Sequence, residues 1–109
     1  MTLLDFKRQQ AARLHKQAQA RSAEGDRDGA IAAYLQALAL DPKKSASHYN
    51  LGLRYKYEGD WERSFEHNLA ANNLDPDDQA ARWNLAIAAT ALATLGGGAA
   101  DLASRRHHA

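Results

Sequence analysis

The sequence contains no cysteine, only two prolines and no excess of either charge. Without cysteine the chain has no disulfide framework and no thiolate chemistry, so disulfide-stabilised folds and cysteine-based catalysis are both excluded. A formal net charge of +1 over 109 residues creates no overall field that would recruit nucleic acid or an anionic membrane. We therefore expect no nucleic acid and no membrane among the partners, and a cytoplasmic location fits these absences.

The chain also lacks an apolar run of the kind that enters or crosses a membrane. Near the N-terminus, Leu3 and Leu4 are followed at once by Asp5, so the apolar segment is too short for a secretory signal. Residues 83–100 carry no charge, but they are rich in alanine and contain three consecutive glycines. A spanning helix needs sustained large aliphatic side chains, so we interpret this stretch as a packed helix followed by a linker.

A repeat of 34 residues organises most of the chain. Glycine provides the left-handed cap that ends one helix, and the aspartate after it caps the next helix. An aspartate that precedes proline is pushed out of helical geometry, which ends the second helix of the unit. Each repeat is thus predicted to be a helix, a turn and a second helix. The motifs that recur at this spacing are Asp41-Pro42 as Asp75-Pro76, Gly25-Asp26 as Gly59-Asp60, and Tyr49-Asn50-Leu51-Gly52 as Trp83-Asn84-Leu85-Ala86.

On these landmarks the chain resembles the tetratricopeptide repeat (TPR) family, and within it a small, bacterial-type, stand-alone array. The resemblance implies an all-α fold, a TPR-like α-solenoid of antiparallel helix pairs in which each unit buries its apolar face only against its neighbours. The first positions of the repeats fall at Ala11, Ser45 and Gln79.

These positions divide the chain into two full repeats and a partial third. The expected array covers residues 1–95, and residues 96–109 are expected to form a Gly-rich linker and a short or disordered tail. The units within the array are repeat 1 at about 11–44, repeat 2 at about 45–78 and partial repeat 3 at about 79–95.

The first and third repeats depart from the family pattern. Gln17 and Arg21 stand where leucine and tyrosine are usual, and Ala93-Thr94 replace the Gly-Asp turn of the third repeat. The third repeat therefore has no recognisable second helix. Its first helix carries apolar residues around much of its circumference, and such a helix normally has cover on more than one side.

The middle repeat carries a glycine, Gly52, inside its first helix, where glycine costs about 0.5–1 kcal/mol relative to alanine. The matching places in the other repeats hold the small residues Ala18 and Ala86. We expect the absent side chain to allow the second helix of the repeat to approach closely.

In the TPR family the concave face is lined by the first helix of each repeat. The family's positions make this face polar at one end and aromatic or aliphatic at the other, which suits an extended peptide or a partner helix. The alternative is that the aromatic and aliphatic side chains contact one another between adjacent helices and are simply core. The residues that we expect to bind a ligand are His15, Gln19, Tyr49, Leu53, Lys56, Tyr57, Trp83 and Ile87.

Little in the sequence supports catalysis or cofactor binding. TPR members that hold a C-terminal carboxylate use a clamp of lysine, asparagine and arginine, of which only Asn50 is matched, so a carboxylate would lack its charge-assisted hydrogen bonds. None of the five histidines pairs with a carboxylate at metal-ligand spacing on a helix. No glycine-rich phosphate loop joins a strand to a helix. We expect no enzyme activity, no metal and no cofactor.

The sequence is therefore interpreted as a non-catalytic protein–protein interaction module, a scaffold that binds a peptide or a partner helix on its concave face. The alternative is a self-assembling structural protein that forms a homo-oligomer through the exposed first helix of repeat 3 and the C-terminal region. Two features favour the alternative: that helix itself, and the opposed charges of the basic first helix of the chain and the acidic residues 60–78.

Overall fold

A computed structural model describes residues 1–95 of the chain. The expectations for residues 96–109, a glycine-rich linker and a tail, lie outside the described residues.

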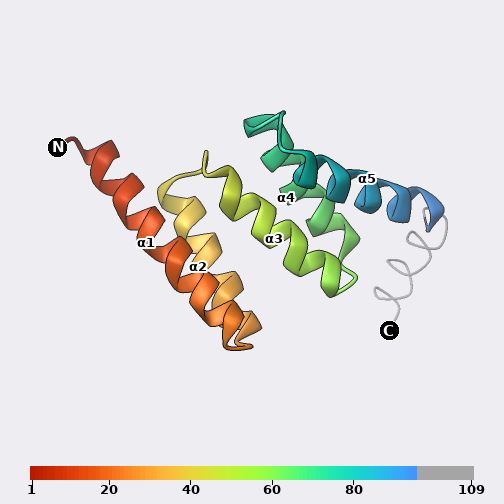
Figure 1. Ribbon diagram of the computed structural model, residues 1–109, viewed down its shortest axis with the longest axis horizontal. Coiled ribbons are helices and arrows are strands. Elements are labelled where there is room, and N and C mark those ends of the chain that lie inside the picture. The colour runs from red at the N-terminus through yellow and green to blue at the C-terminus, as the bar shows by residue number, and fades with distance from the viewer. Residues whose placement is uncertain (96–109) are drawn as a thin grey trace, which may run out of the picture.

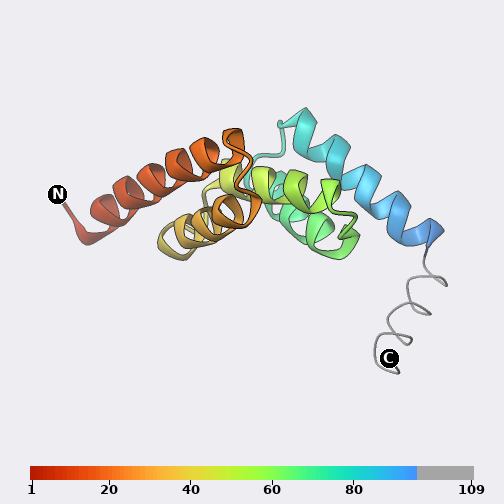
Figure 2. The same ribbon diagram turned by 90° about the horizontal axis from the view of Figure 1, so that it is seen from below.

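Five α-helices follow one another along these residues. The pairs α1–α2 and α3–α4 are each antiparallel and joined by a short turn, and α5 packs on α4 (Figure 1). In Figure 2, α1, α3 and α5 lie above α2 and α4, so we call the first three the A helices and the other two the B helices. Residues 1–95 contain no strand, and the predicted all-α array of helix pairs is confirmed. The helices are α1 (Leu3–Ala23), α2 (Arg27–Leu40), α3 (Ser45–Tyr57), α4 (Trp61–Leu74) and α5 (Gln79–Thr94).

The repeat is visible in the backbone angles of the turns between the paired helices. Gly25 and Gly59 have φ angles of 84° and 74°, a region that glycine enters without steric cost. Asp26 and Asp60 follow with nearly identical angles, φ −83° and ψ 81° against φ −84° and ψ 80°. Each aspartate accepts a hydrogen bond from the backbone N–H three residues later, at 2.9 and 3.2 Å. The aspartates therefore satisfy donors that the first turn of a helix leaves unpaired.

The B helices end in the same repeated way. Asp41 and Asp75 share a φ of −138°, with ψ angles of 86° and 84°. Each stands before a proline, which keeps the residue out of helical geometry. The next A helix then begins within a few residues, with Asp78 capping α5 by accepting from the N–H of Ala81 at 3.1 Å.

The core lies between the A and B helices and is built largely from alanine. Small side chains let helix backbones approach closely, while the few large side chains fill the seam where α2 meets α3. This seam joins repeat 1 to repeat 2. The core cluster consists of Ala18, Ala30, Ala33, Tyr34, Leu38, Leu51 and Tyr55, with Ile31 packed against it.

Helices α3 and α4 approach each other closely at Gly52. A Cβ atom added there would lie 2.5 Å from Nδ2 of Asn68, a fully buried residue of α4. The Ser64 hydroxyl donates to the Gly52 carbonyl at 2.8 Å, and Asn68 Nδ2 donates to the Ser64 carbonyl at 2.9 Å. The predicted close approach is confirmed, and a buried amide fills the space that a side chain would take.

We expect Gly52→Ala to destabilise the fold by about 1 kcal/mol. Overpacking a tight contact costs about 1–3 kcal/mol, which outweighs the about 0.5–1 kcal/mol that alanine gains over glycine inside a helix. In a domain of this size, a loss of about 1 kcal/mol lowers the melting temperature by about 4–8 °C, and circular dichroism would measure it. Adding Asn68→Ala, which removes the amide that the methyl group meets, should recover most of the loss. An unchanged melting temperature for Gly52→Ala would contradict the close contact.

Candidate peptide-binding face

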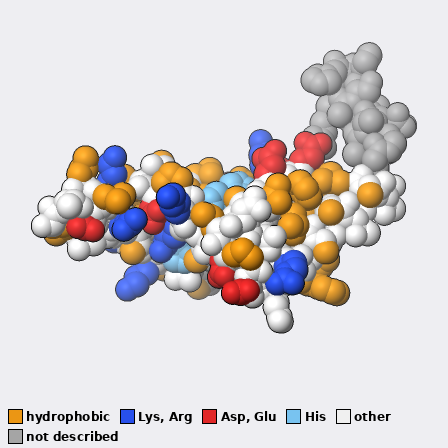
Figure 3. All heavy atoms as spheres, turned by 90° about the horizontal axis from the view of Figure 1, so that it is seen from above, with side chains coloured by type: hydrophobic (Ala, Val, Ile, Leu, Met, Phe, Trp, Pro, Cys, Tyr) orange, Lys and Arg blue, Asp and Glu red, His pale blue; other side chains and the backbone are white. Residues whose placement is uncertain are grey.

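The A helices carry all eight residues that the sequence nominates as ligand contacts, and we call the surface that α1, α3 and α5 form the A face. His15 and Gln19 lie on α1, Trp83 and Ile87 on α5, and the rest on α3. Seen from above, basic side chains lie mostly towards the α1 end of the molecule and hydrophobic ones gather towards the α5 end (Figure 3).

Two large aromatic side chains of the A face are open to solvent. Tyr57 is 70% exposed and Trp83 is 69% exposed. Tyr49, Leu53 and Ile87 are partly buried. Trp83 is therefore not a core residue. The partly buried side chains pack against their neighbours and also keep some surface exposed to solvent. Apolar surface therefore remains on α3 and α5 after the helices have packed.

Lys56 connects α3 to α5 on this face. Its Nζ donates to Oδ1 of Asn84 at 3.3 Å and lies 5.9 Å from the centroid of the Tyr57 ring. Asn84, a buried residue of α5, is therefore held by a hydrogen bond from the neighbouring helix. The other polar candidate, Gln19, is exposed on α1.

His15 is placed differently from the other candidates. It is only 8% exposed, and its Nδ1 lies 2.9 Å from the Ser47 hydroxyl of α3. Its ring meets that of Tyr34 of α2 edge to face, with centroids 5.3 Å apart. Burial, with a smaller effect from the charge of Lys44, lowers the pKa of His15. The ring is packed in the seam of three helices, so it presents little surface to a ligand.

An open pocket on α5 marks where a B helix would lie in a complete repeat. Its residues stand 34 positions after the α3 residues that include His48 and Gly52, both of which contact α4. Within residues 1–95 no sixth helix follows α5, so the equivalent surface stays open. The pocket is lined by Gln79, Arg82, Trp83 and Ala86.

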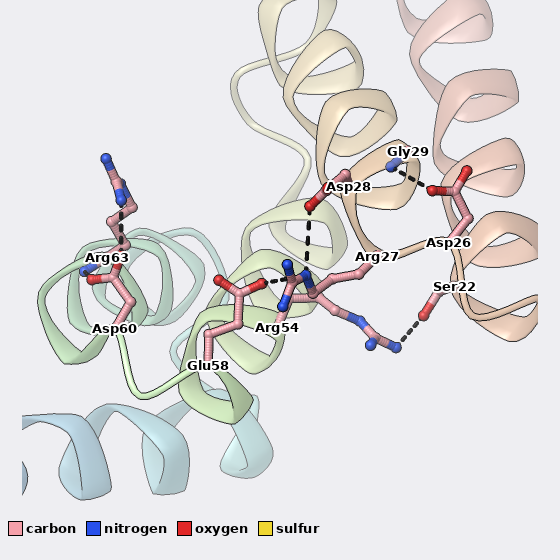
Figure 4. Close-up of polar contacts among 9 residues, drawn as sticks. All are labelled: Ser22, Asp26, Arg27, Asp28, Gly29, Arg54, Glu58, Asp60 and Arg63. Atoms are coloured by element: carbon pink, nitrogen blue, oxygen red, sulfur yellow. Dashed lines mark hydrogen bonds and ion pairs between the residues drawn. The ribbon is translucent and has the colours of Figure 1, made fainter.

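Polar contacts tie the first helix pair to the second near the turns that join each pair (Figure 4). Arg27 at the start of α2 forms an ion pair with Glu58 at the end of α3, with Nε and Oε1 3.0 Å apart. Arg54 of α3 donates to the hydroxyl of Ser22 of α1. These contacts hold neighbouring repeats in register beside the A face.

Sequence reasoning missed a pair of histidines between α3 and α4. Nδ1 of His48 lies 3.2 Å from Nδ1 of His67, and His48 Nε2 lies 3.1 Å from the carbonyl oxygen of Pro42. A carbonyl only accepts, so the network assigns the His48 proton to Nε2 and makes His67 the Nδ1–H donor of the pair. The His67 ring also stacks on Tyr55, with centroids 5.6 Å apart.

The pair could have been found from the antiparallel geometry of the repeat. Gly52 of α3 faces Asn68 of α4, and these two helices are antiparallel. A residue one helical turn before Gly52 therefore lies opposite a residue at or after about Asn68. His48 and His67 lie close to those positions. What this pairing does not reveal is the rotamer of each ring, which depends on Pro42 and Tyr55.

The described residues offer little support for metal or membrane chemistry. Residues 1–95 contain no group of three or more histidine, aspartate or glutamate side chains placed to hold a metal ion. Among the helices of the described part, none is both long and apolar enough to cross a membrane.

The histidines packed between helices predict that the free energy of unfolding falls in acid. Burial, with smaller effects from the charges of His48 and Arg63, lowers the pKa of His67 to about 4. In the unfolded chain a histidine takes up its proton near pH 6.5, whereas folded His67 stays neutral. The contribution of His67 to the free energy of unfolding is therefore fully present above about pH 6.5 and is lost as the pH drops towards 4. Urea unfolding across this range would measure the slope.

In His67→Gln we expect a shallower fall of stability between these pH values, because one group with a lowered pKa is gone. His15 contributes in the same direction and should leave a residual slope. An NMR titration of the folded protein gives an independent reading of the imidazole. A His67 midpoint near 6.5 together with an unchanged slope in the variant would contradict the assignment.

Comparison with known proteins agrees with this architecture. The family model described as TPR repeat matches residues 18–57, from the end of α1 through α3. No curated protein matches the chain. TPR repeats generally mediate protein–protein interaction. The matched segment, the antiparallel helix pairs and the 34-residue period together support a protein of the tetratricopeptide repeat type.

Proposed function

We propose that the chain is a non-catalytic protein–protein interaction module, a scaffold of the cytoplasm, that binds a peptide or a partner helix on a concave A face. The observation that carries the proposal is the exposure of Tyr57 and Trp83, at 70% and 69%. Large aromatic side chains are the ones that most often contribute the bulk of binding energy at protein interfaces. Here they project from two neighbouring helices whose packing does not use them.

The surroundings of these two side chains support an anchoring role. Leu53 lies one turn before Tyr57 on α3, and Ile87 lies one turn after Trp83 on α5, and both are partly buried. Lys56 holds the two helices together through Asn84. A ligand would therefore meet two exposed rings on a backing that is already ordered, which lowers the cost of binding.

The test is a screen of displayed random peptides against the folded protein, followed by affinity measurements on variants. For a selected peptide, Trp83→Ala and Tyr57→Ala should each weaken binding about tenfold or more, or about 1.4 kcal/mol. Leu35→Ala is the matched control, since Leu35 is an exposed apolar residue of the B helix α2, at 44%. It should change the affinity by less than about twofold. Selected peptides that bind both aromatic variants as well as the native protein would exclude the A face as the site.

A second candidate is self-assembly through α5. The supporting observation is the pocket of Gln79, Arg82, Trp83 and Ala86, at the place where a complete repeat has a B helix. Another copy of the chain could lie there across a two-fold axis and bury both pockets. Only Arg82 is charged in α5, so apolar burial rather than ion pairing would hold such a dimer together.

Light scattering after gel filtration distinguishes the two candidates. Self-assembly through α5 predicts a dimer that persists at high salt, because apolar burial is not screened. Trp83→Arg should shift it to monomer, while Leu35→Arg on the B helix α2 should not. A monomer at micromolar concentration would remove self-assembly from consideration. A dimer that dissociates only at high salt would point to the charged surfaces instead.

A further inference from the structure

Positive charge is concentrated on the A helices, whereas most acidic side chains lie in the turns and connections between helices. The A helices hold eight lysines and arginines but a single acidic residue, Asp5. The remainder of residues 1–95 holds four lysines and arginines and eleven acidic residues. A net charge of +1 for the whole chain hides this division. The cations of the A helices are Lys7, Arg8, Arg13, Lys16, Arg21, Arg54, Lys56 and Arg82.

Helix capping explains much of the acidic half. Asp26, Asp60 and Asp78 each accept a backbone N–H at the start of a helix. Glu58 pairs with Arg27 between the repeats. These acids are therefore placed by the needs of the fold, and their position in the turns says little about a partner.

The basic half is not explained in the same way. Among the ion pairs of the described residues, only Arg21 of the eight A-helix cations takes part, with Asp26. Arg54 and Lys56 lie in the last turn of α3, where the helix dipole favours cations. Arg82 of α5 donates to the carbonyl of Pro76 at 2.8 Å. The other four lie in the first turns or the middle of α1, where the dipole offers no such gain. Structure alone therefore does not account for the positive charge of α1.

Three of the eight cations lie on the helices that carry the aromatic anchors, two on α3 and one on α5. Lys56 reaches Asn84 across the seam between α3 and α5, the helices that carry Tyr57 and Trp83. Arg54 reaches Ser22 across the seam between α3 and α1. Positive charge is thus present at both seams of the A face, and at the seam between α3 and α5 it lies beside the exposed Tyr57 ring.

We propose that the A face takes a partner segment that is acidic: a peptide or helix in which aspartate or glutamate alternates with large apolar side chains. The inference rests on the proposed function and adds the chemistry of the ligand. The apolar side chains would pack on Tyr57 and Trp83, and the carboxylates would lie near the cations of α1 and α3. Complementary charge of this kind speeds association and excludes basic competitors, and carboxylates gain charge-assisted hydrogen bonds from lysine and arginine.

Nucleic acid fits the same face less well. A phosphate backbone needs a continuous basic track, but Asp75, Asp77 and Asp78 lie directly before α5, and Glu24 and Glu58 end the other two A helices. A short acidic peptide can lie between these ends, whereas a nucleic acid strand continues past them.

The experiment reads the charge of the peptides that the screen selects. A random displayed library panned on the folded protein should return sequences enriched in aspartate and glutamate over the input, with large apolar residues between them. One selected peptide is then compared with its own version in which every acidic residue is replaced by its amide. The acidic form should bind about tenfold or more tightly than the amide form at low salt. This difference in affinity should become smaller as salt is added.

Two charge-reversal variants locate the cations. Lys16→Glu on α1 should weaken the acidic peptide at least about threefold and leave its amide version unchanged. Lys43→Glu alters the net charge by the same amount in the α2–α3 connection, outside the A helices, and should alter neither affinity. Lys16 is exposed, so its substitution is expected to leave the fold intact, which circular dichroism would check.

The outcomes separate this inference from the proposed function. Selected peptides that depend on Trp83 but bind equally as acid and amide would overturn the acidic ligand and leave the peptide-binding face in place. A library that returns no binder would count against both. Tighter binding of a single-stranded oligonucleotide than of the acidic peptide would overturn the inference. So would a low-salt dimer broken by Lys16→Glu, because the acids would then belong to a second copy.

Discussion

The close crossing of A and B helices at small residues is the contact on which the rest of this array depends. At Gly52 the backbone of α3 comes within hydrogen-bonding distance of Ser64, and Ala18 occupies the same place in repeat 1. A solenoid repeat buries its apolar face only against neighbouring helices. Because those helices meet through small side chains, few large side chains are buried between them. Tyr57 and Trp83 remain outside the contact, and both leave apolar surface exposed on the A helices.

The same close packing puts polar groups into the seams, where each needs a partner. His15 meets Ser47, and His48 meets His67. A buried polar group without a partner costs about 1–3 kcal/mol, so both contacts stabilise the helix packing only while their hydrogen bonds persist. The contact between His48 and His67 also requires that one of the two facing nitrogens carries no proton, since a second proton between the rings would be repelled. The geometry of the A face is therefore coupled to histidine protonation through the seams beneath it.

The 34-residue period predicted the parts of the fold that local chemistry decides. Gly25 and Gly59 adopt the left-handed geometry that ends a helix, and the helix bounds follow from them and from the Asp-Pro steps. Side-chain burial was harder to predict. His15 was assigned to the open face by its position in the family pattern, but the same turn of α1 is closed by Tyr34 and Ser47 from two other helices. Such closure depends on which residues the neighbouring repeats supply, and a single helix does not reveal it.

The third repeat departs from the other two in the part of α5 that a second helix would cover. Ala86 stands where Gly52 stands in α3, so α5 has a surface suited in shape to a B helix, but within residues 1–95 no further helix follows. The absent cover exposes Trp83 at the edge of the pocket, beside the A face. One local departure from the repeat thus gives α5 an apolar surface that the charge pattern of α1 does not share. In the proposed complex, the apolar side chains of the ligand therefore pack on Tyr57 and Trp83 of α3 and α5, while its carboxylates lie near the cations of α1 and α3.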